Sequence, residues 1–148
     1  MAKLGRYAAQ RRKIEQVTAN KTVEVSDCGT VFFVNPAAAT TLTLPTPSDA
    51  GNGWWCRVHV HEGAAATAGD LSHAVNVSMS GEVVLGQVVS ADGGAGDMAV
   101  ANDDFFNFSA AASGGDMAEF MTDGTRWYVW GIVQDSSDGD ARFHTSAE

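Results

Sequence analysis

The chain has 148 residues, 45% of them hydrophobic, a length that suits a single domain with its own buried core. It carries a formal net charge of −9, and it has no apolar run of about 18 residues, the minimum for a membrane-spanning helix. No apolar segment follows the basic first residues, so we expect no signal peptide and synthesis in the cytoplasm. Cys28 and Cys56 are expected to be reduced there, with a single bridge between them after release as the alternative.

The charges divide the chain into a basic beginning and an acidic remainder. Six of the nine basic residues lie in the first 21 positions against one acid, so this segment carries +5 and residues 22–148 carry −14. A basic arm on an acidic body usually binds a negatively charged partner. A phosphate backbone would repel the acidic body, so we expect an acidic protein surface or another copy of the chain; the alternative is a solvated tail. The expected binding residues of the arm are Lys3, Arg6, Arg11, Arg12 and Lys13.

The spacing of apolar residues changes after the arm. Residues 3–17 have a partial apolar stripe that fits a short helix needing a partner surface, or an extended arm. From residue 22 the period becomes two, which is typical of strands. We expect strands over 22–26, 30–35, 40–45, 54–62, 74–80, 82–90, 104–110, 117–122 and 125–133. Between the last two, Asp123-Gly124 predicts a two-residue hairpin turn of type I′.

Glycine-rich loops separate these strands, and no segment of helical period lies between them. The pattern predicts an all-β fold, an antiparallel β-sandwich or a jelly-roll-like barrel, with a basic N-terminal arm or short helix. We expect an arm over residues 1–21, a sandwich over 22–134, and over 135–148 a polar tail that alone would be disordered.

The stretch WWCRVHVHE carries two tryptophans and two histidines. Alternation predicts that Trp54 faces the core and that Trp55, His59 and His61 face away from it. Two histidines about 7 Å apart on one strand could share a metal, and their spacing resembles the start of the cupin metal motif. However, Glu62 follows the second histidine directly and the second cupin motif has no counterpart. We therefore expect exposed or interface histidines and no metal or other cofactor.

Signatures of other active sites are missing from the sequence. It contains no nucleophile elbow, phosphate-binding loop or zinc-finger pairing, so we expect no enzyme activity. The loop over 91–104 holds four aspartates, but their spacing is not that of an EF-hand. A solvated acidic loop is expected there, with weak calcium binding as the alternative.

The last predicted strand has bulky apolar residues on both faces. Tyr128, Trp130 and Ile132 share one face, and Trp127 lies on the other. Such a strand either is central in a sandwich or meets another subunit with its outer face. We therefore expect Trp55, Tyr128 and Trp130 at a subunit interface. Stacking of a sugar on an exposed tryptophan is the alternative.

The stretches VEVSDCGTVFFVNPAAATTLTLPTPSDAGNGWWCRVHV and DGTRWYVWGIV resemble segments of small virion proteins of tailed bacteriophages. The shared features are an Asp-x-Gly turn, a Thr-Leu-Thr-Leu-Pro strand, a glycine-led aromatic strand, a closing hairpin and a short basic N-terminus. They cover residues 22–62 and 117–133. Such proteins include capsid decoration (cement) proteins and modules of tail fibres. The resemblance implies a β-rich subunit on the virion surface, often trimeric, and fixes no catalytic group.

A chain of this length without a long repeat or stalk favours decoration over a fibre. We therefore expect a capsid decoration subunit that binds the outside of the major capsid protein lattice, stabilises it by many weak contacts, and forms a homotrimer. Neither nucleic acid nor a membrane is an expected partner. A tail-fibre or tail-tip module that binds a receptor or glycan is the alternative, and a cupin-like metal-binding protein is a third. Deleting residues 1–16 is expected to abolish capsid attachment and to leave the sandwich folded.

Overall fold

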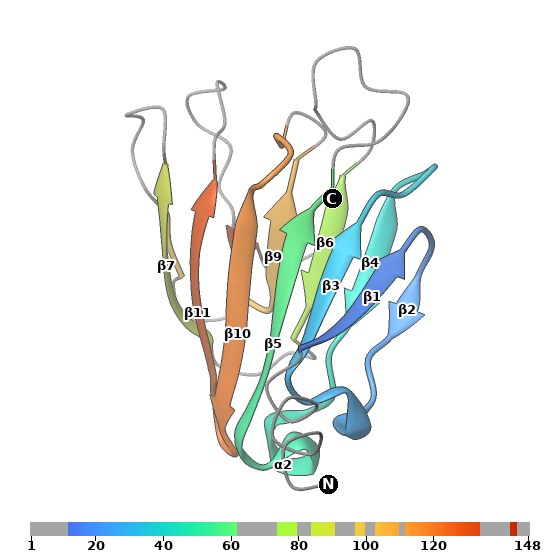
Figure 1. Ribbon diagram of the computed structural model, residues 1–148. Coiled ribbons are helices and arrows are strands. Elements are labelled where there is room, and N and C mark those ends of the chain that lie inside the picture. Colours follow the sequence, from blue (N-terminus) through green and yellow to red (C-terminus); the bar gives the residue numbers. More distant parts are fainter. Residues whose placement is uncertain are drawn as a thin grey trace, which may run out of the picture.

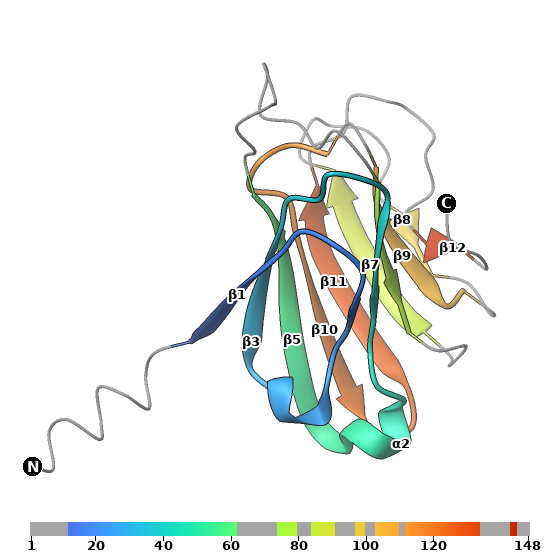
Figure 2. The same cartoon turned by 90° about the vertical axis from the view of Figure 1, so that its right-hand side faces the viewer.

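The computed structural model describes residues 12–61, 74–79, 84–90, 97–99, 103–109, 112–133 and 143–144. Figure 1 shows two β-sheets that pack against each other, and the hydrophobic core lies between them. In the side view of Figure 2, the short helix α2 (Pro47–Ala50) lies at one end of the two layers. The predicted all-β sandwich is confirmed.

The larger sheet has seven strands. In spatial order they are β1 (Lys13–Val17), β3 (Thr30–Val34), β5 (Asn52–Val60), β10 (Met117–Asp123), β11 (Trp127–Val133), β7 (Val84–Ser90) and β8 (Asp97–Met98). The smaller sheet has five strands. In spatial order they are β12 (Phe143–His144), β9 (Phe105–Phe108), β6 (Val75–Ser78), β4 (Thr40–Thr43) and β2 (Lys21–Thr22).

Both sheets are mixed rather than antiparallel throughout. The parallel pairs are β1–β3, β3–β5 and β11–β7 in the larger sheet and β2–β4 and β4–β6 in the smaller. Successive strands from β1 to β7 alternate between the two sheets. Because the chain reverses direction at each crossing, every second strand runs the same way. Parallel neighbours therefore form here without the helical crossovers of a βαβ fold.

Aromatic side chains from both sheets fill the core. Trp54 and Trp127 pack edge to face with their ring centroids 5.6 Å apart. Phe106 of β9 meets Phe120 of β10 across the two layers at 5.8 Å. A Cβ at Gly131 would lie 2.5 Å from the carbonyl oxygen of the neighbouring strand, so β11 approaches β10 too closely there for any other residue.

The first part of the chain differs from the predicted elements. Residues 1–11 lie outside the described residues, and residues 13–17 form β1, so of the two predicted conformations this part has the extended one and not the helix. Of the predicted strand over 22–26 only Thr22 lies in a strand, β2, and Val25–Asp27 forms a 3₁₀ turn, η1. There the Trp54 indole N–H donates to the Val25 carbonyl at 2.8 Å, and the carboxylate of Asp27 accepts from a backbone N–H. These hydrogen bonds from and to side chains take the place of the backbone pairing that a strand would form.

The hairpin of β10 and β11 is confirmed, but its loop is longer than the two-residue turn predicted. Thr122 pairs with Trp127, so four residues separate the paired positions. Asp123 Oδ1 accepts hydrogen bonds from the N–H groups of Thr125 (2.8 Å) and Arg126 (2.9 Å). The Asp123 side chain thus stabilises a turn that is longer than the predicted two-residue turn.

The sandwich also extends past the predicted boundaries at residues 21 and 134. At the start, β1 joins the larger sheet and β2 the smaller one. At the end, Phe143 of the predicted polar tail is buried and packs against Phe106 at 5.4 Å. A Cβ at Gly86 would lie 2.7 Å from the Phe143 ring, so the glycine makes room for this contact. One apolar residue in a polar segment was too weak a signal to predict a core position.

Candidate functional site

The outer face of the larger sheet, turned away from the core, carries large exposed apolar side chains. Alternation along β11 buries Trp127 and leaves Tyr128, Trp130 and Ile132 on the outside. The predicted division of this strand between two faces is confirmed.

The neighbouring strands β7 and β10 continue this surface on either side of β11. Strand register places nine side chains in three rows of three, which we call the outer array. Its rows are Leu85–Tyr128–Met121, Gln87–Trp130–Glu119 and Val89–Ile132–Met117. Six of the nine are large apolar residues that keep between 40% and 55% of their surface exposed: Leu85, Val89, Met121, Tyr128, Trp130 and Ile132. Contiguous exposed apolar surface of this kind marks an interaction site.

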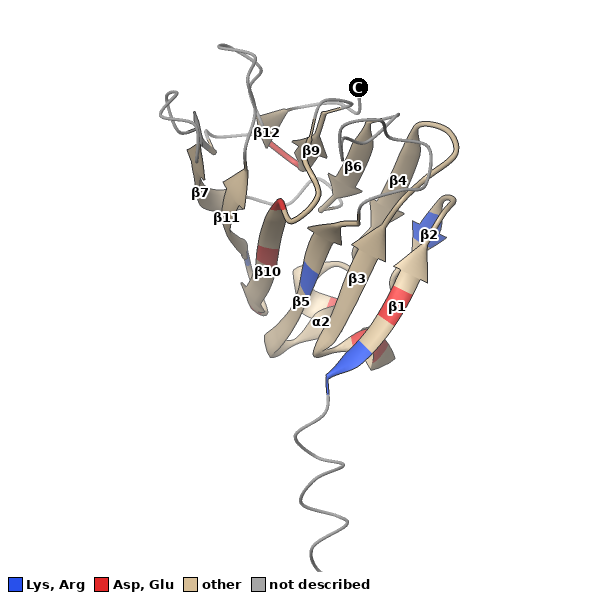
Figure 3. Cartoon of the chain, turned by 45° about the horizontal axis from the view of Figure 1, so that its top comes forward, with Lys and Arg blue, Asp and Glu red and all other residues tan. Residues whose placement is uncertain are grey.

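Charge is sparse on the outer array. Strands β7 and β11 contain no Asp, Glu, Lys or Arg. The only charged member is Glu119, which accepts a hydrogen bond from Arg57 Nε on β5 at 3.0 Å. Figure 3 shows basic and acidic residues close together on β1, β2 and the adjoining turn, whereas β7 and β11 are drawn without either. The array is therefore a nearly neutral surface on an acidic protein.

Trp55 extends the first row of the array onto β5, because it pairs with Met121. Its ring is half-buried, and the guanidinium of Arg12 lies 5.6 Å from the ring centroid. This contact is a cation–π interaction that covers part of the ring. The structure thus brings the three predicted interface residues, Trp55, Tyr128 and Trp130, to one face of one sheet.

His59 of β5 and His61, which follows the end of that strand, belong to an aromatic cluster. Phe33 of β3 stacks on His59 with centroids 5.4 Å apart and meets His61 edge-on at 6.0 Å. Burial lowers the pKa of His59, and the positive charges of Arg57 and Arg12 lower it further. Among the described residues, no three His, Cys, Asp or Glu side chains gather into a metal-binding group.

The other two histidines of the sequence are His73 and His144. His73 is outside the described residues, and His144 is on β12 of the opposite sheet. Of the suggested calcium loop, Asp92 is also outside the described residues. Asp103 is buried, and the N–H of Asp104 donates to the His144 carbonyl at 3.0 Å. These two aspartates thus lie where β9 meets the last strand.

Both cysteines are free thiols. Cys56 is a core residue, as predicted for a small apolar side chain, and burial raises the pKa of its thiol. Cys28 is exposed beside the 3₁₀ turn.

Two of the five predicted arm residues lie within the described part of the chain. Lys3, Arg6 and Arg11 fall outside it, whereas Arg12 lies over Trp55. Lys13 forms an ion pair with Asp27 in the body of the protein. The sequence placed Lys13 in a partner-binding arm, but its charge already has an internal partner.

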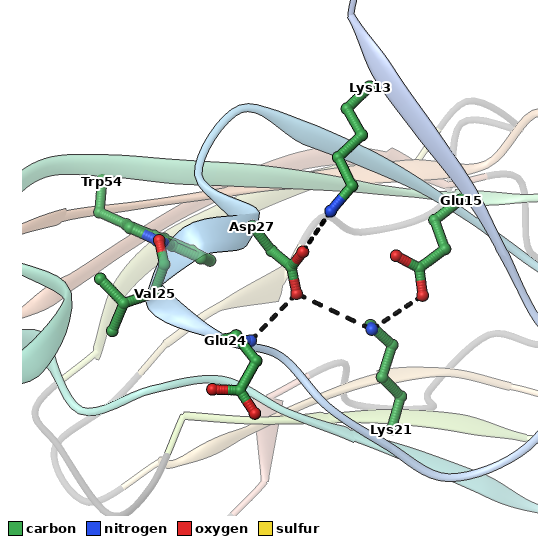
Figure 4. A network of polar contacts seen from close by, with 7 residues as sticks. All are labelled: Lys13, Glu15, Lys21, Glu24, Val25, Asp27 and Trp54. Atoms are coloured by element: carbon green, nitrogen blue, oxygen red, sulfur yellow. Dashed lines mark hydrogen bonds and ion pairs between the residues drawn. The ribbon is translucent and has the colours of Figure 1, made fainter.

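Asp27 is the centre of a charged network that connects the two sheets (Figure 4). Its carboxylate, 5% exposed, accepts hydrogen bonds from Lys13 on β1 and from the Glu24 N–H at 3.1 Å. Lys21 of β2 lies 3.8 Å from the same carboxylate and bonds to Glu15 at 2.8 Å. Burial by itself raises the pKa of Asp27, but the bonds from Lys13 and Glu24 outweigh it, so the pKa is lowered. The bond to Glu15 raises the pKa of Lys21.

We expect Asp27→Asn to reduce the free energy of unfolding by about 2 kcal/mol at pH 7, because it removes charge-assisted hydrogen bonds. A carboxylate whose folded pKa is lowered stabilises the fold above its unfolded pKa of about 4, and this stabilisation is lost as the pH falls through the folded pKa. The difference between the two proteins should therefore shrink at pH 3. Urea unfolding of both proteins at pH 7 and pH 3 measures the difference in their free energies of unfolding. The same difference at both pH values would show that the charge of Asp27 does not stabilise the fold.

Leu85 and Val89 of β7 were not identified as surface residues from the sequence, because alternation does not show which face of this strand is outward. Leu85 and Val89 each neighbour a buried valine, Val84 and Val88, so both faces of this strand are apolar. Adjacent apolar pairs in one strand are the signal that could have identified them.

Comparison with protein-family models, curated proteins and solved structures found no match to this chain. In the described part of the chain, no helix is long and apolar enough to cross a membrane.

Proposed function

We propose that this chain is a structural virion protein, a capsid decoration subunit that works by protein–protein contact and has no catalytic role. The observation that carries the proposal is the outer array, a neutral apolar surface on a sheet whose other face already forms the core. Protein interfaces combine an apolar centre with few charges, and Trp, Tyr and Met are enriched in them. The assignment to a virion comes from the resemblance of the sequence to small phage virion proteins.

The distribution of positive charge supports attachment through the N-terminal segment. Residues 1–12 contain four basic residues and no acid. In the described body, Lys13, Lys21 and Arg57 all have acidic partners within the chain. Much of the positive charge left for an acidic partner is therefore in residues 1–12. An acidic groove on the major capsid protein would attract this segment, and repetition over a lattice multiplies modest affinities.

A tail-fibre or tail-tip module that binds glycans is the second candidate. Trp130 lies between Gln87 and Glu119, and a sugar ring can stack on tryptophan while polar neighbours bind its hydroxyl groups. The aliphatic residues around it, such as Leu85 and Ile132, favour protein, because they offer sugar hydroxyls no hydrogen-bonding partner.

The position and copy number of the chain in purified phage particles test the proposal. Cryo-electron microscopy and quantitative mass spectrometry should find many copies at the symmetry axes of the capsid lattice. A few copies at one vertex would support the tail module instead. Particles that lack the chain would refute both candidates.

A further inference from the structure

We propose that the outer array binds the outer array of a second copy of this chain, face to face, about a two-fold axis that runs along β11. This inference rests on one part of the proposed function, namely that the array is a protein-binding surface. It goes further by naming the bound protein as a second copy of the chain. Both strands that flank β11, β7 and β10, take part equally, and Trp130 lies at the centre.

The charges favour a second copy over another kind of partner. Two chains of net charge −9 repel each other over most of their surfaces. The array is a place where they can meet at modest electrostatic cost, since Arg57 compensates Glu119 and the Tyr128 hydroxyl donates to Asp123 at its edge. A basic partner would gain little from this neutral surface. Interfaces between identical subunits are also the most apolar class.

The arrangement of the rows selects the axis. In face-to-face pairing the two-fold axis lies in the plane of the interface. Two directions in that plane place array residues directly opposite one another, one along β11 and one along the central row. An axis along β11 places Leu85 opposite Met121, Val89 opposite Met117, and Gln87 opposite Glu119 of the second copy. Every apolar residue then faces another, and the Gln87 amide can donate to a carboxylate.

The other axis is less favourable because it sets like charges against each other. An axis along the central row would place Glu119 opposite Glu119 of the second copy. Arg57 offsets part of their repulsion, but each carboxylate then faces a second carboxylate instead of the amide donor of Gln87, so this arrangement is the weaker one. The array is therefore complementary to itself about the axis along β11.

The size of the array sets the expected affinity. Three strands of seven residues span roughly 14 by 23 Å of sheet. This footprint of about 320 Å² per copy is well below the ~800 Å² of a standard interface, so we expect a weak dimer with a dissociation constant of about 10–100 μM. The resemblance to phage virion proteins implies trimers, but a trimer joins two different surfaces of each subunit, whereas the array pairs with itself.

Two substitutions at Gln87 test both the surface and the axis. Gln87 is exposed and lies outside the core, so neither Gln87→Lys nor Gln87→Glu should prevent folding. With the axis along β11, the lysine faces Glu119 and lowers the dissociation constant, whereas the new carboxylate faces Glu119 and raises it about tenfold or more. With the axis along the central row, each new charge faces its own copy, and both substitutions weaken the dimer.

Sedimentation equilibrium of the full chain between about 1 and 100 μM measures these constants. Ala38→Lys and Ala38→Glu make the same charge changes on the exposed loop between β3 and β4 and serve as controls. Opposite shifts at Gln87, beyond those at Ala38, support the proposal. A monomer throughout the range, a trimer, shifts of the same sign, or shifts equal to the controls would overturn it.

Capsid binding by Gln87→Glu separates this inference from the proposed function. A variant that no longer dimerises but still sediments with capsids shows that self-association and decoration are distinct, and both proposals stand. A wild-type chain that dimerises as expected but is missing from phage particles refutes decoration alone.

Discussion

Deletion of residues 1–11 is expected to weaken attachment to capsids about a hundredfold or more while the sandwich stays folded. The deletion removes Lys3, Arg6 and Arg11, three positive charges in a segment without acids. Exposed ion pairs contribute up to about 1 kcal/mol each, so three together account for about a hundredfold in affinity. Repetition over the capsid lattice increases the loss.

The end point of the deletion matters because β1 begins at Lys13. Removal of residues 1–11 leaves β1 paired with β3 from Lys13 to Val17. The longer deletion of residues 1–16 would remove most of this strand and the partner of Asp27, so the sequence-based expectation that it leaves the sandwich intact conflicts with the fold. The shorter deletion separates binding from folding.

Co-sedimentation of the purified chain with capsids that lack it measures the attachment. Replacing Lys3, Arg6 and Arg11 by glutamine keeps the length and should have nearly the same effect as the deletion. Arg126→Gln removes one exposed positive charge from the loop between β10 and β11 and is the control. Wild-type attachment should also weaken as salt is added, because exposed charges are screened. Undiminished binding by the shortened chain would refute the role of this segment.

Phe106→Ala is expected to reduce the free energy of unfolding by about 3–5 kcal/mol. Phe106 is fully buried on β9, and its ring packs against Phe108 at 4.9 Å in the same strand. It also meets Phe143 of β12 and Phe120 of the opposite sheet. The alanine variant leaves a cavity between the two layers and removes the contact that holds the last strand. The loss is a large part of the stability of a typical domain, about 5–15 kcal/mol.

Denaturant unfolding of Phe106→Ala and Ile132→Ala compares the two faces of the sandwich. Ile132 keeps 44% of its surface exposed, so its truncation should cost less than about 1 kcal/mol when the protein is dilute enough to be monomeric. Equal losses from the two substitutions would contradict a core that lies between the sheets.

The direction of most strand side chains could be predicted from the sequence, because it is a local property of extended backbone. Trp54 faces the core and Trp55 the outside, and the same division holds for Trp127 and Trp130. Eight of the nine predicted strands correspond to strands of the two sheets. Of the ninth, over 22–26, only Thr22 lies in a strand, because bonds from Trp54 and Asp27, both made in the folded protein, stabilise a turn after it.

Neither the fold boundaries nor the charged network could be predicted in this way. Phe143 is one apolar residue in a polar segment. It is part of the core because Gly86 has no side chain and leaves room for the Phe143 ring. Lys13 looked like part of a free basic arm, and only the position of Asp27 beside β1 gives it a partner. Both contacts join residues far apart in the chain, so no local pattern signals them.

By itself, the sequence determined that the protein is all-β, which side chains share a face of a strand, and that positive charge is concentrated at the N-terminus. Only the tertiary structure decided that the strands alternate between sheets, that parallel neighbours result, and that β7, β11 and β10 lie side by side to form the outer array. The physical reason is the range of the forces involved. Alternation depends on neighbouring residues, whereas strand pairing depends on the packing of the whole core.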